Sequence, residues 1–146
     1  MMFSGFTALG AGPTSPGSTG RLAIDTPVPG VRVIRLSGEL GSASGARLLR
    51  LLDAQLHMTR AGHRGFDAIV ADVADVQAVM RGGPQALAHA HYACARQGIE
   101  FVLAGHCHAL LLAPVGVRRR LNAVRMFPDV DTAVAMLAPA GRAVEA

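Results

Sequence analysis

The chain has 146 residues, of which 51% are hydrophobic and 16% are charged. This composition excludes a disordered chain, which would be rich in charge and poor in apolar side chains, and the length fits one folded domain. The formal net charge of +4 comes from arginine without any lysine, but aromatic residues make up only 4% and tryptophan is absent, so nucleic acid is not an expected partner.

Cysteine content and hydropathy indicate a cytoplasmic protein. Two cysteines are too few for a secreted domain held together by disulfides, and no CxxC pair is present. The first twenty residues lack the basic and apolar segments of a secretion signal. The longest apolar run is short and is interrupted by Pro114, so we expect no membrane insertion.

The folded domain is expected at residues 21–138, between a flexible tail at 1–20, rich in Gly, Ser, Thr and Pro, and a C-terminal tail at 139–146. The domain opens with a short strand candidate, RLAIDT (21–26). After two prolines and a glycine it continues with VRVIRLSGEL (31–40), which contains several β-branched residues. These two segments predict a β-hairpin.

Residues 43–58 predict an amphipathic helix capped by Ser42 or Ser44. Its apolar stripe consists of Leu48, Leu49, Leu52 and Leu56. The nearly continuous apolar segment 66–73 predicts a strand that is covered on both faces.

A double glycine and a proline then lead into an alanine-rich helix, expected from Pro84 to Gln97 and ended by Gly98. The remaining predicted elements are a buried strand at 99–105, a short helix at 108–112, an edge strand in VRMF (124–127), and a final helix at 129–137 capped by Asp129 or Asp131. The pattern of residues 114–125 assigns no element. Alternating strands and helices predict an α/β sandwich, with a mixed sheet of four to five strands, parallel in its later part, and about four helices.

Several segments, in this order, resemble the STAS family, the domain of bacterial anti-sigma factor antagonists. VRVIRLSGEL is similar to the family's strand that ends in L-x-G-E-L, and AIVADVADVQAV resembles the strand that carries its D-L-S-x-V motif. ARQGIEFVLAG resembles the family's helix end, glycine and next strand. The resemblance covers residues 21 to about 138 and implies a protein-binding regulator of transcription.

The turn before the second helix departs from the family pattern D-S-S-G-L. In the family, a partner kinase phosphorylates the second serine, and phosphorylation abolishes binding to that partner. In this sequence Met80 stands at the aspartate, Arg81 at the first serine and Gly82 at the phosphorylated serine, and only Gly83 matches. Neither Arg81 nor Gly82 offers an acceptor oxygen, so the family's phosphorylation switch cannot operate at this position. Gly41 also replaces the aspartate that follows G-E-L.

The resemblance implies that the turn and the SGEL segment bind an anti-sigma factor and displace its sigma factor. The expected contact residues are Ser37, Gly38, Glu39, Met80, Arg81, Gly82, Gly83 and Gln85. Binding would then be constitutive or controlled by expression, a redox change or a ligand. Three alternatives stay open: glycines that only permit a tight turn, a small anion or nucleotide held by Arg81 and the free N–H groups of the helix start, and a regulatory subunit of a larger assembly such as a transporter.

Other polar residues indicate no cofactor, metal or catalytic site. His89 and His91 lie two apart on a helix and therefore point in nearly opposite directions, so they cannot share a metal without distortion. Cys94 and Cys107 could form a reversible disulfide, although Cys94 falls on the buried stripe of its helix and is expected to pack as a small hydrophobic residue.

The run Arg118, Arg119 and Arg120 is expected on a solvated surface, with contact to an acidic partner as the alternative. Asp72 and Asp75 are expected to cap backbone groups at a strand end rather than to act as acid and base. No nucleophile stands beside a base in a recognisable motif, so the sequence predicts a protein that is not an enzyme. A homodimer is possible.

Overall fold

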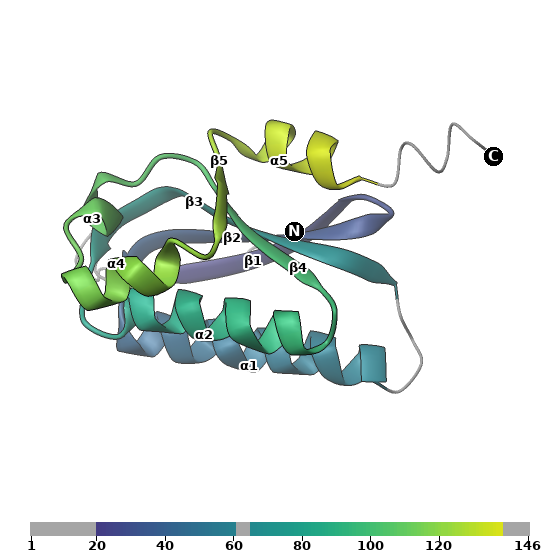
Figure 1. Ribbon diagram of the computed structural model, residues 1–146, viewed down its shortest axis with the longest axis horizontal. Coiled ribbons are helices and arrows are strands. Elements are labelled where there is room, and N and C mark those ends of the chain that lie inside the picture. Colours follow the sequence, from purple (N-terminus) through teal and green to yellow (C-terminus); the bar gives the residue numbers. More distant parts are fainter. Residues whose placement is uncertain (1–19, 61–64, 139–146) are drawn as a thin grey trace, which may run out of the picture.

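A computed structural model describes residues 20–60 and 65–138 of the chain (Figure 1). The elements in chain order are β1 (Arg21–Val28), β2 (Gly30–Leu40), α1 (Ser42–Arg60), β3 (Phe66–Val79), α2 (Gly83–Arg96), β4 (Glu100–Ala104), α3 (His108–Leu111), α4 (Val115–Leu121), β5 (Arg125–Phe127) and α5 (Val130–Leu137). The tails predicted at 1–20 and 139–146 lie outside the described residues except for Gly20, which is buried and whose carbonyl accepts a hydrogen bond from Arg47.

The strands form one five-stranded sheet in the order β1-β2-β3-β4-β5. The β1–β2 pair is antiparallel, as predicted for the hairpin, and the three following pairs are parallel. Helical connections carry the chain from one parallel strand to the next, which is the arrangement that the alternating sequence pattern predicts. The α/β class and the mixed sheet are confirmed, with five helices in the described residues instead of about four.

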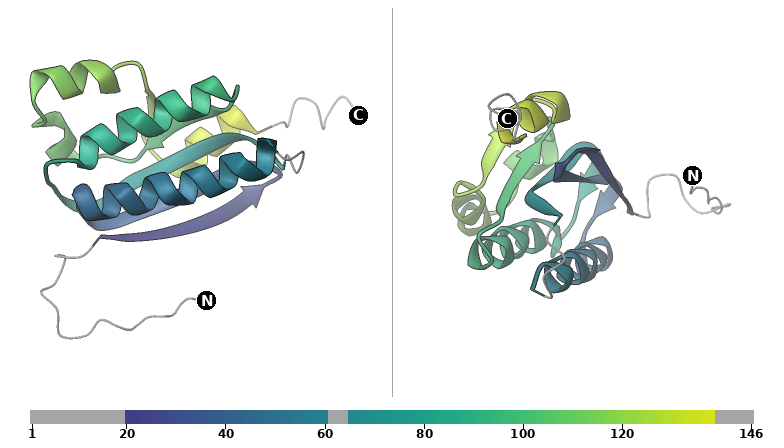
Figure 2. Two further views of the ribbon diagram at one scale, coloured as in Figure 1. Left: turned by 90° about the horizontal axis from the view of Figure 1, so that it is seen from below. Right: turned by 90° about the vertical axis from the view of Figure 1, so that its right-hand side faces the viewer.

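Helices cover both faces of the sheet, but unequally. α1 and α2 lie side by side on one face, and α5 lies on the other (Figures 1 and 2). Alternate residues of the strands supply the two cores, since successive side chains of a strand point to opposite faces. Leu103 of β4 belongs to the large core under α1 and α2, whereas its neighbour Val102 belongs to the small core under α5.

β3 is longer than the predicted strand 66–73 and continues to Val79. The added residues pair with the end of β2, where Ser37 lies opposite Asp75 and Glu39 lies opposite Ala78. Their alternating polar and apolar side chains hid this extension, because the prediction relied on a continuous apolar run. Asp72 and Asp75 therefore lie inside β3 and not at its end. Asp72 still caps a backbone group, as predicted, since its Oδ1 accepts a hydrogen bond from the Ala74 N–H at 3.0 Å.

The helix starts differ from the prediction in one case and agree in another. Ser42 is the first helical residue of α1, so it is not the N-cap. Ser44, in the first turn of α1, accepts from the N–H of Gly41 at 2.9 Å and donates to the carbonyl of Glu39 at 2.9 Å. At the other end of the chain, Asp129 is the N-cap of α5 and accepts from the Thr132 N–H at 2.7 Å.

Candidate functional site

The turn between β3 and α2 is tied to the end of β2 and to the start of α1. The Met80 N–H donates to the Leu40 carbonyl at 2.8 Å, which holds the turn against β2. The Ser42 hydroxyl donates to the Arg81 carbonyl at 3.1 Å, which holds the turn against α1. Two segments that are far apart in the sequence, 40–42 and 80–83, therefore form a single surface.

Both glycines of the turn are required by its geometry. Gly82 has φ of +95°, a left-handed conformation that favours glycine, and a Cβ there would lie 2.7 Å from the Ser42 Oγ. A Cβ on Gly83 would lie 2.4 Å from the Leu40 carbonyl oxygen, which is part of the backbone. The glycines thus do permit a tight turn, as one interpretation of the sequence proposed, and they bring three elements into close contact.

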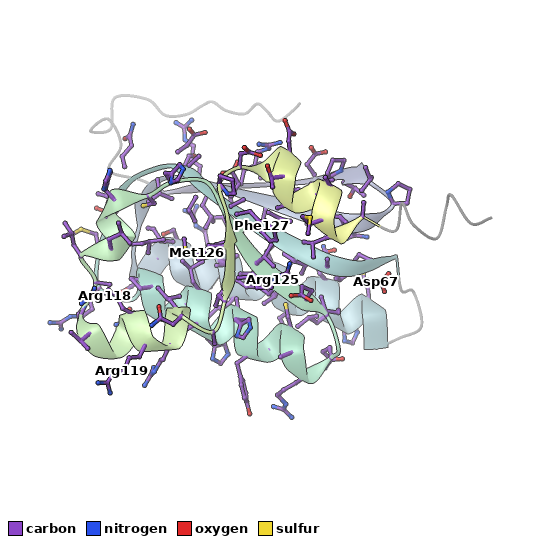
Figure 3. The ribbon with its side chains drawn as sticks, turned by 45° about the horizontal axis from the view of Figure 1, so that its top comes forward. Asp67, Arg118, Arg119, Arg125, Met126 and Phe127 are labelled. Carbon is purple, nitrogen blue, oxygen red and sulfur yellow. The ribbon has the colours of Figure 1, made fainter. Side chains whose placement is uncertain are left out.

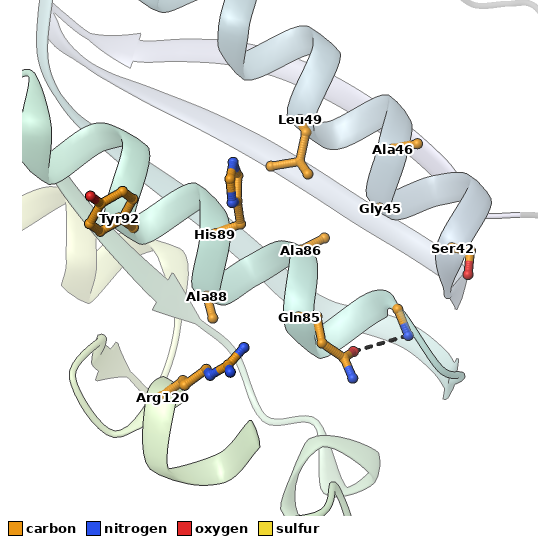
Figure 4. A pocket seen from close by; sticks show the side chains of 11 residues that line it. Ser42, Gly45, Ala46, Leu49, Gln85, Ala86, Ala88, His89, Tyr92 and Arg120 are labelled. Atoms are coloured by element: carbon orange, nitrogen blue, oxygen red, sulfur yellow. Dashed lines mark hydrogen bonds between the residues drawn. The ribbon is translucent and has the colours of Figure 1, made fainter. Parts of the chain in front are cut away.

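The N–H groups at the start of α2 are largely used inside the protein. The Gly82 N–H donates to the Gln85 Oε1 at 3.0 Å, the bond drawn in Figure 4, and the Gly83 N–H donates to the Met80 carbonyl at 3.0 Å. Pro84 has no N–H. An anion at this helix start would have to compete with these bonds, so the geometry does not favour the anion alternative.

The predicted contact residues are not equally accessible. Met80 is 50% exposed and Arg81 is also exposed, whereas Gly83 is buried. Ser37, Gly38 and Glu39 are half-buried in β2, which lies between β1 and β3. β1 pairs with β2 as far as Ser37, and the extended β3 pairs with the other side of β2 along the whole SGEL segment. Met80 and Arg81 are the predicted residues that a partner can reach most directly.

An open groove of about 760 Å³ lies between α1 and α2 and begins at this turn (Figure 4). It is lined by Ser42, Gly45, Ala46, Leu49, Gly82, Gln85, Ala86, Ala88, His89, Tyr92 and Arg120. The two helices approach closely because their facing residues are small: a Cβ on Gly45 would lie 2.9 Å from the Ala86 Cβ. Sequence reasoning placed Gln85 and Gly82 near this surface and missed the residues from α1 and α4. The small residues at the start of both helices were the feature of the sequence that could have indicated this close approach.

The arginine run lies on α4, within the stretch to which the sequence assigned no element. Arg118, Arg119 and Arg120 are all exposed, as predicted for a solvated surface (Figure 3 labels the first two). Only Arg120 lines the groove. The buried neighbours Val117 and Leu121 anchor α4 in the core.

The two cysteines are free thiols. Cys94 is fully buried in the core, as predicted, and burial raises the pKa of its thiol to about 12. A thiol with so high a pKa is a poor nucleophile for disulfide exchange, so this environment does not favour the redox hypothesis. Within the described ranges, no three His, Cys, Asp or Glu side chains are close enough to hold a metal ion together.

No protein-family model matches the sequence, and no curated protein matches it significantly. Among solved structures, an anti-sigma factor antagonist from Mycobacterium paratuberculosis matches with a TM-score of 0.65 at 18% identity, covering 84% of this chain and 97% of that one. A sulfate transporter family protein from Wolinella succinogenes matches with a TM-score of 0.57 at 22% identity, covering 80% and 88%. The anti-sigma factor antagonist SpoIIAA in its unphosphorylated form matches with a TM-score of 0.54 at 14% identity, covering 80% and 94%.

These similarities confirm the STAS fold that the sequence motifs indicated. At such low identity they establish the fold, and function has to be argued from the site. In the part of the chain that the structure describes, no helix is long and apolar enough to cross a membrane.

Proposed function

We propose that this protein is a non-catalytic regulator that binds an anti-sigma factor of the serine-kinase type and displaces its sigma factor. The observation that carries the proposal is the surface formed by Met80, Arg81 and the groove between α1 and α2, on a fold shared with two anti-sigma factor antagonists. Position 82 is a glycine in a left-handed conformation. Because glycine has no hydroxyl to accept a phosphoryl group, binding is not controlled by phosphorylation at the position where the resemblance expects a serine.

Met80 is the central apolar contact in this proposal. Its side chain is half exposed, in a turn whose backbone is tied to β2 by the Met80 N–H and to α1 by the Ser42 hydroxyl, so the place of this side chain on the surface is set before binding. Burying the exposed half of this methionine side chain at an interface is worth about 0.7 to 1.5 kcal/mol, half of the value for a fully exposed one. An adaptable apolar side chain held at a fixed backbone position beside an open groove is a suitable centre for a protein interface.

The charge on the face covered by α1 and α2 indicates the chemistry of the partner. The exposed arginines on α1, α2, α4 and the turn are Arg47, Arg50, Arg81, Arg96, Arg118, Arg119 and Arg120. Asp53 is the one acidic residue in the described parts of these helices and this turn. Complementary charges steer encounter and set register, so the anti-sigma factor is expected to present an acidic surface here.

Binding of the purified chain to the serine-kinase anti-sigma factors of its source organism tests the proposal. Isothermal titration calorimetry should detect a complex with one of them, and Met80→Glu should weaken it by about tenfold or more. Met136→Glu is the matched control, because Met136 is 63% exposed but lies on α5, at the opposite face of the sheet. Absence of binding to every such factor, or equal weakening by both variants, would refute the proposal.

The similarity to a sulfate transporter family protein supports one second candidate, a regulatory module of a transporter. Affinity purification of the native chain from solubilised membranes distinguishes the two functions. Recovery of a transport protein, together with no binding to anti-sigma factors, would favour the second candidate.

A further inference from the structure

A serine hydroxyl lies next to position 82, although residue 82 itself has none. A Cβ built on Gly82 would stand 2.7 Å from the Oγ of Ser42 and 3.0 Å from its Cα. The Ser42 hydroxyl thus occupies the space into which a side chain at position 82 would project. Residue 42 is distant in the sequence, and only the contact between α1 and the turn brings it there.

Ser42 is also the accessible serine among the three near this turn. Ser44 is only 4% exposed, and its hydroxyl bonds to backbone groups of Glu39 and Gly41. Ser37 is half-buried in β2, between two neighbouring strands. Ser42 is exposed, lines the groove and makes one weak bond, to the Arg81 carbonyl. A kinase bound to this surface could reach its Oγ without unfolding any element.

We propose that Ser42 is the phosphorylation site of this protein and that its phosphorylation releases the partner. This inference rests on the proposed function, because the kinase is the anti-sigma factor that binds the turn. The Ser42 Oγ attacks the γ-phosphorus of a nucleoside triphosphate, and an O–P bond forms as the bond to the bridging oxygen breaks. The nucleoside diphosphate leaves, and the hydroxyl proton passes to a base of the kinase.

Phosphorylation at Ser42 changes the turn in two ways. It removes the hydroxyl hydrogen that bonds to the Arg81 carbonyl, and so it unties the turn from α1. It also places a charge of about −1.5 to −2 at the mouth of the groove, where the partner's expected acidic surface would meet it. Both changes weaken the complex, and neither requires a side chain on residue 82.

The experiment combines phosphorylation and binding on the full chain. Each candidate anti-sigma factor is incubated with the chain, Mg²⁺ and ATP, the phosphorylated residue is located by mass spectrometry, and affinity is measured before and after. We expect phosphate on Ser42, no incorporation in Ser42→Ala, restored incorporation in Ser42→Thr, and affinity at least about tenfold weaker after phosphorylation. Thr26→Ala is the control for the loss of an exposed hydroxyl away from the turn, because Thr26 is exposed on β1, the edge strand of the sheet. Its phosphate incorporation should equal that of the native chain. Thermal unfolding of each variant checks that it folds.

The outcomes separate this inference from the proposed function. A stable complex with no phosphate on Ser42, or with phosphate only elsewhere, overturns the inference and leaves the proposed function standing. Phosphate on Ser42 without a change in affinity overturns the release mechanism. Neither binding nor phosphorylation by any of the factors overturns both.

Discussion

The two faces of the sheet differ in size, composition and charge. The face under α1 and α2 contains the large core with Ile34, Leu87 and Leu103, and it carries the groove and most of the exposed arginines. The face under α5 has a small core of valines and alanines around Ala133. Next to that core, the Arg35 guanidinium lies 3.2 Å from the Asp72 carboxylate. The first face holds most of the apolar packing and the candidate binding surface.

This difference teaches that the main core and the proposed binding surface lie on the same face. The small residues that let α1 and α2 approach each other, such as Gly45 and Ala86, also shape the groove floor. The glycines that close the β3–α2 turn also fix the position of Met80. Substitutions on this face are therefore expected to affect both stability and the proposed binding, whereas substitutions on the α5 face provide controls.

The largest difference between the faces is expected from two neighbouring core residues of β4. Leu103→Ala should lower the free energy of unfolding by about 3 to 5 kcal/mol, because it leaves a cavity in the large core. Val102→Ala removes a smaller side chain from the small core and should cost about 2 kcal/mol. Both residues are fully buried, so exposure does not explain the difference. Urea unfolding of both variants measures it, and equal losses would contradict the unequal contribution of the two cores.

The next effect concerns two glycines with positive φ. Gly82→Ala should cost about 3 kcal/mol, since it adds backbone strain and a collision with Ser42. Gly98→Ala is the matched control: its φ is +73°, but a Cβ there would meet nothing within 4 Å, so only the strain of about 1 kcal/mol remains. Thermal unfolding compares the two. A Gly82 variant no less stable than the Gly98 variant would show that the turn can move away from α1.

The fold was largely predictable because its strands and helices follow strong local patterns. The first part of β3 and most of β4 are nearly continuous apolar runs, and the leucine stripe of α1 and the cap Asp129 follow helix rules. The end of β3 was missed because its alternating side chains pair with β2, a contact that a single segment does not reveal. The groove and the position of Ser42 depend on how α1 packs against the turn, which residue spacing alone does not determine.

A smaller effect, on the affinity for the partner, is expected from changes of charge on the face covered by α1 and α2. Arg120→Glu should weaken the complex with the partner by about tenfold, or about 1.4 kcal/mol, because Arg120 lines the groove. Arg118→Glu makes the same change of charge on the same helix but outside the groove, so its effect should be clearly smaller. Titrations at low and high salt measure both. Equal effects would indicate that net charge steers the encounter and that the groove does not contact the partner.

The smallest effect is expected on the α5 face, at Asp129. Hydrogen bonds from Thr132, first from its backbone N–H and then from its side chain, lower the pKa of the Asp129 carboxyl below its usual 3.8. A lowered pKa in the folded state stabilises the protein above the unfolded pKa, and that contribution is lost as the pH falls through the folded value. Asp129→Ala should therefore lower Tm slightly at about pH 7, and the difference from the native chain should shrink as the pH falls below the usual pKa of 3.8 and through the lowered pKa of the folded state. Asp131→Ala removes a carboxylate from the same turn but leaves the bond between Asp129 and Thr132 intact. A Tm difference for Asp129→Ala that stays constant with pH would show that the cap acts through geometry and not through its charge, and α5 would then resemble the uncharged start of α2 on the opposite face.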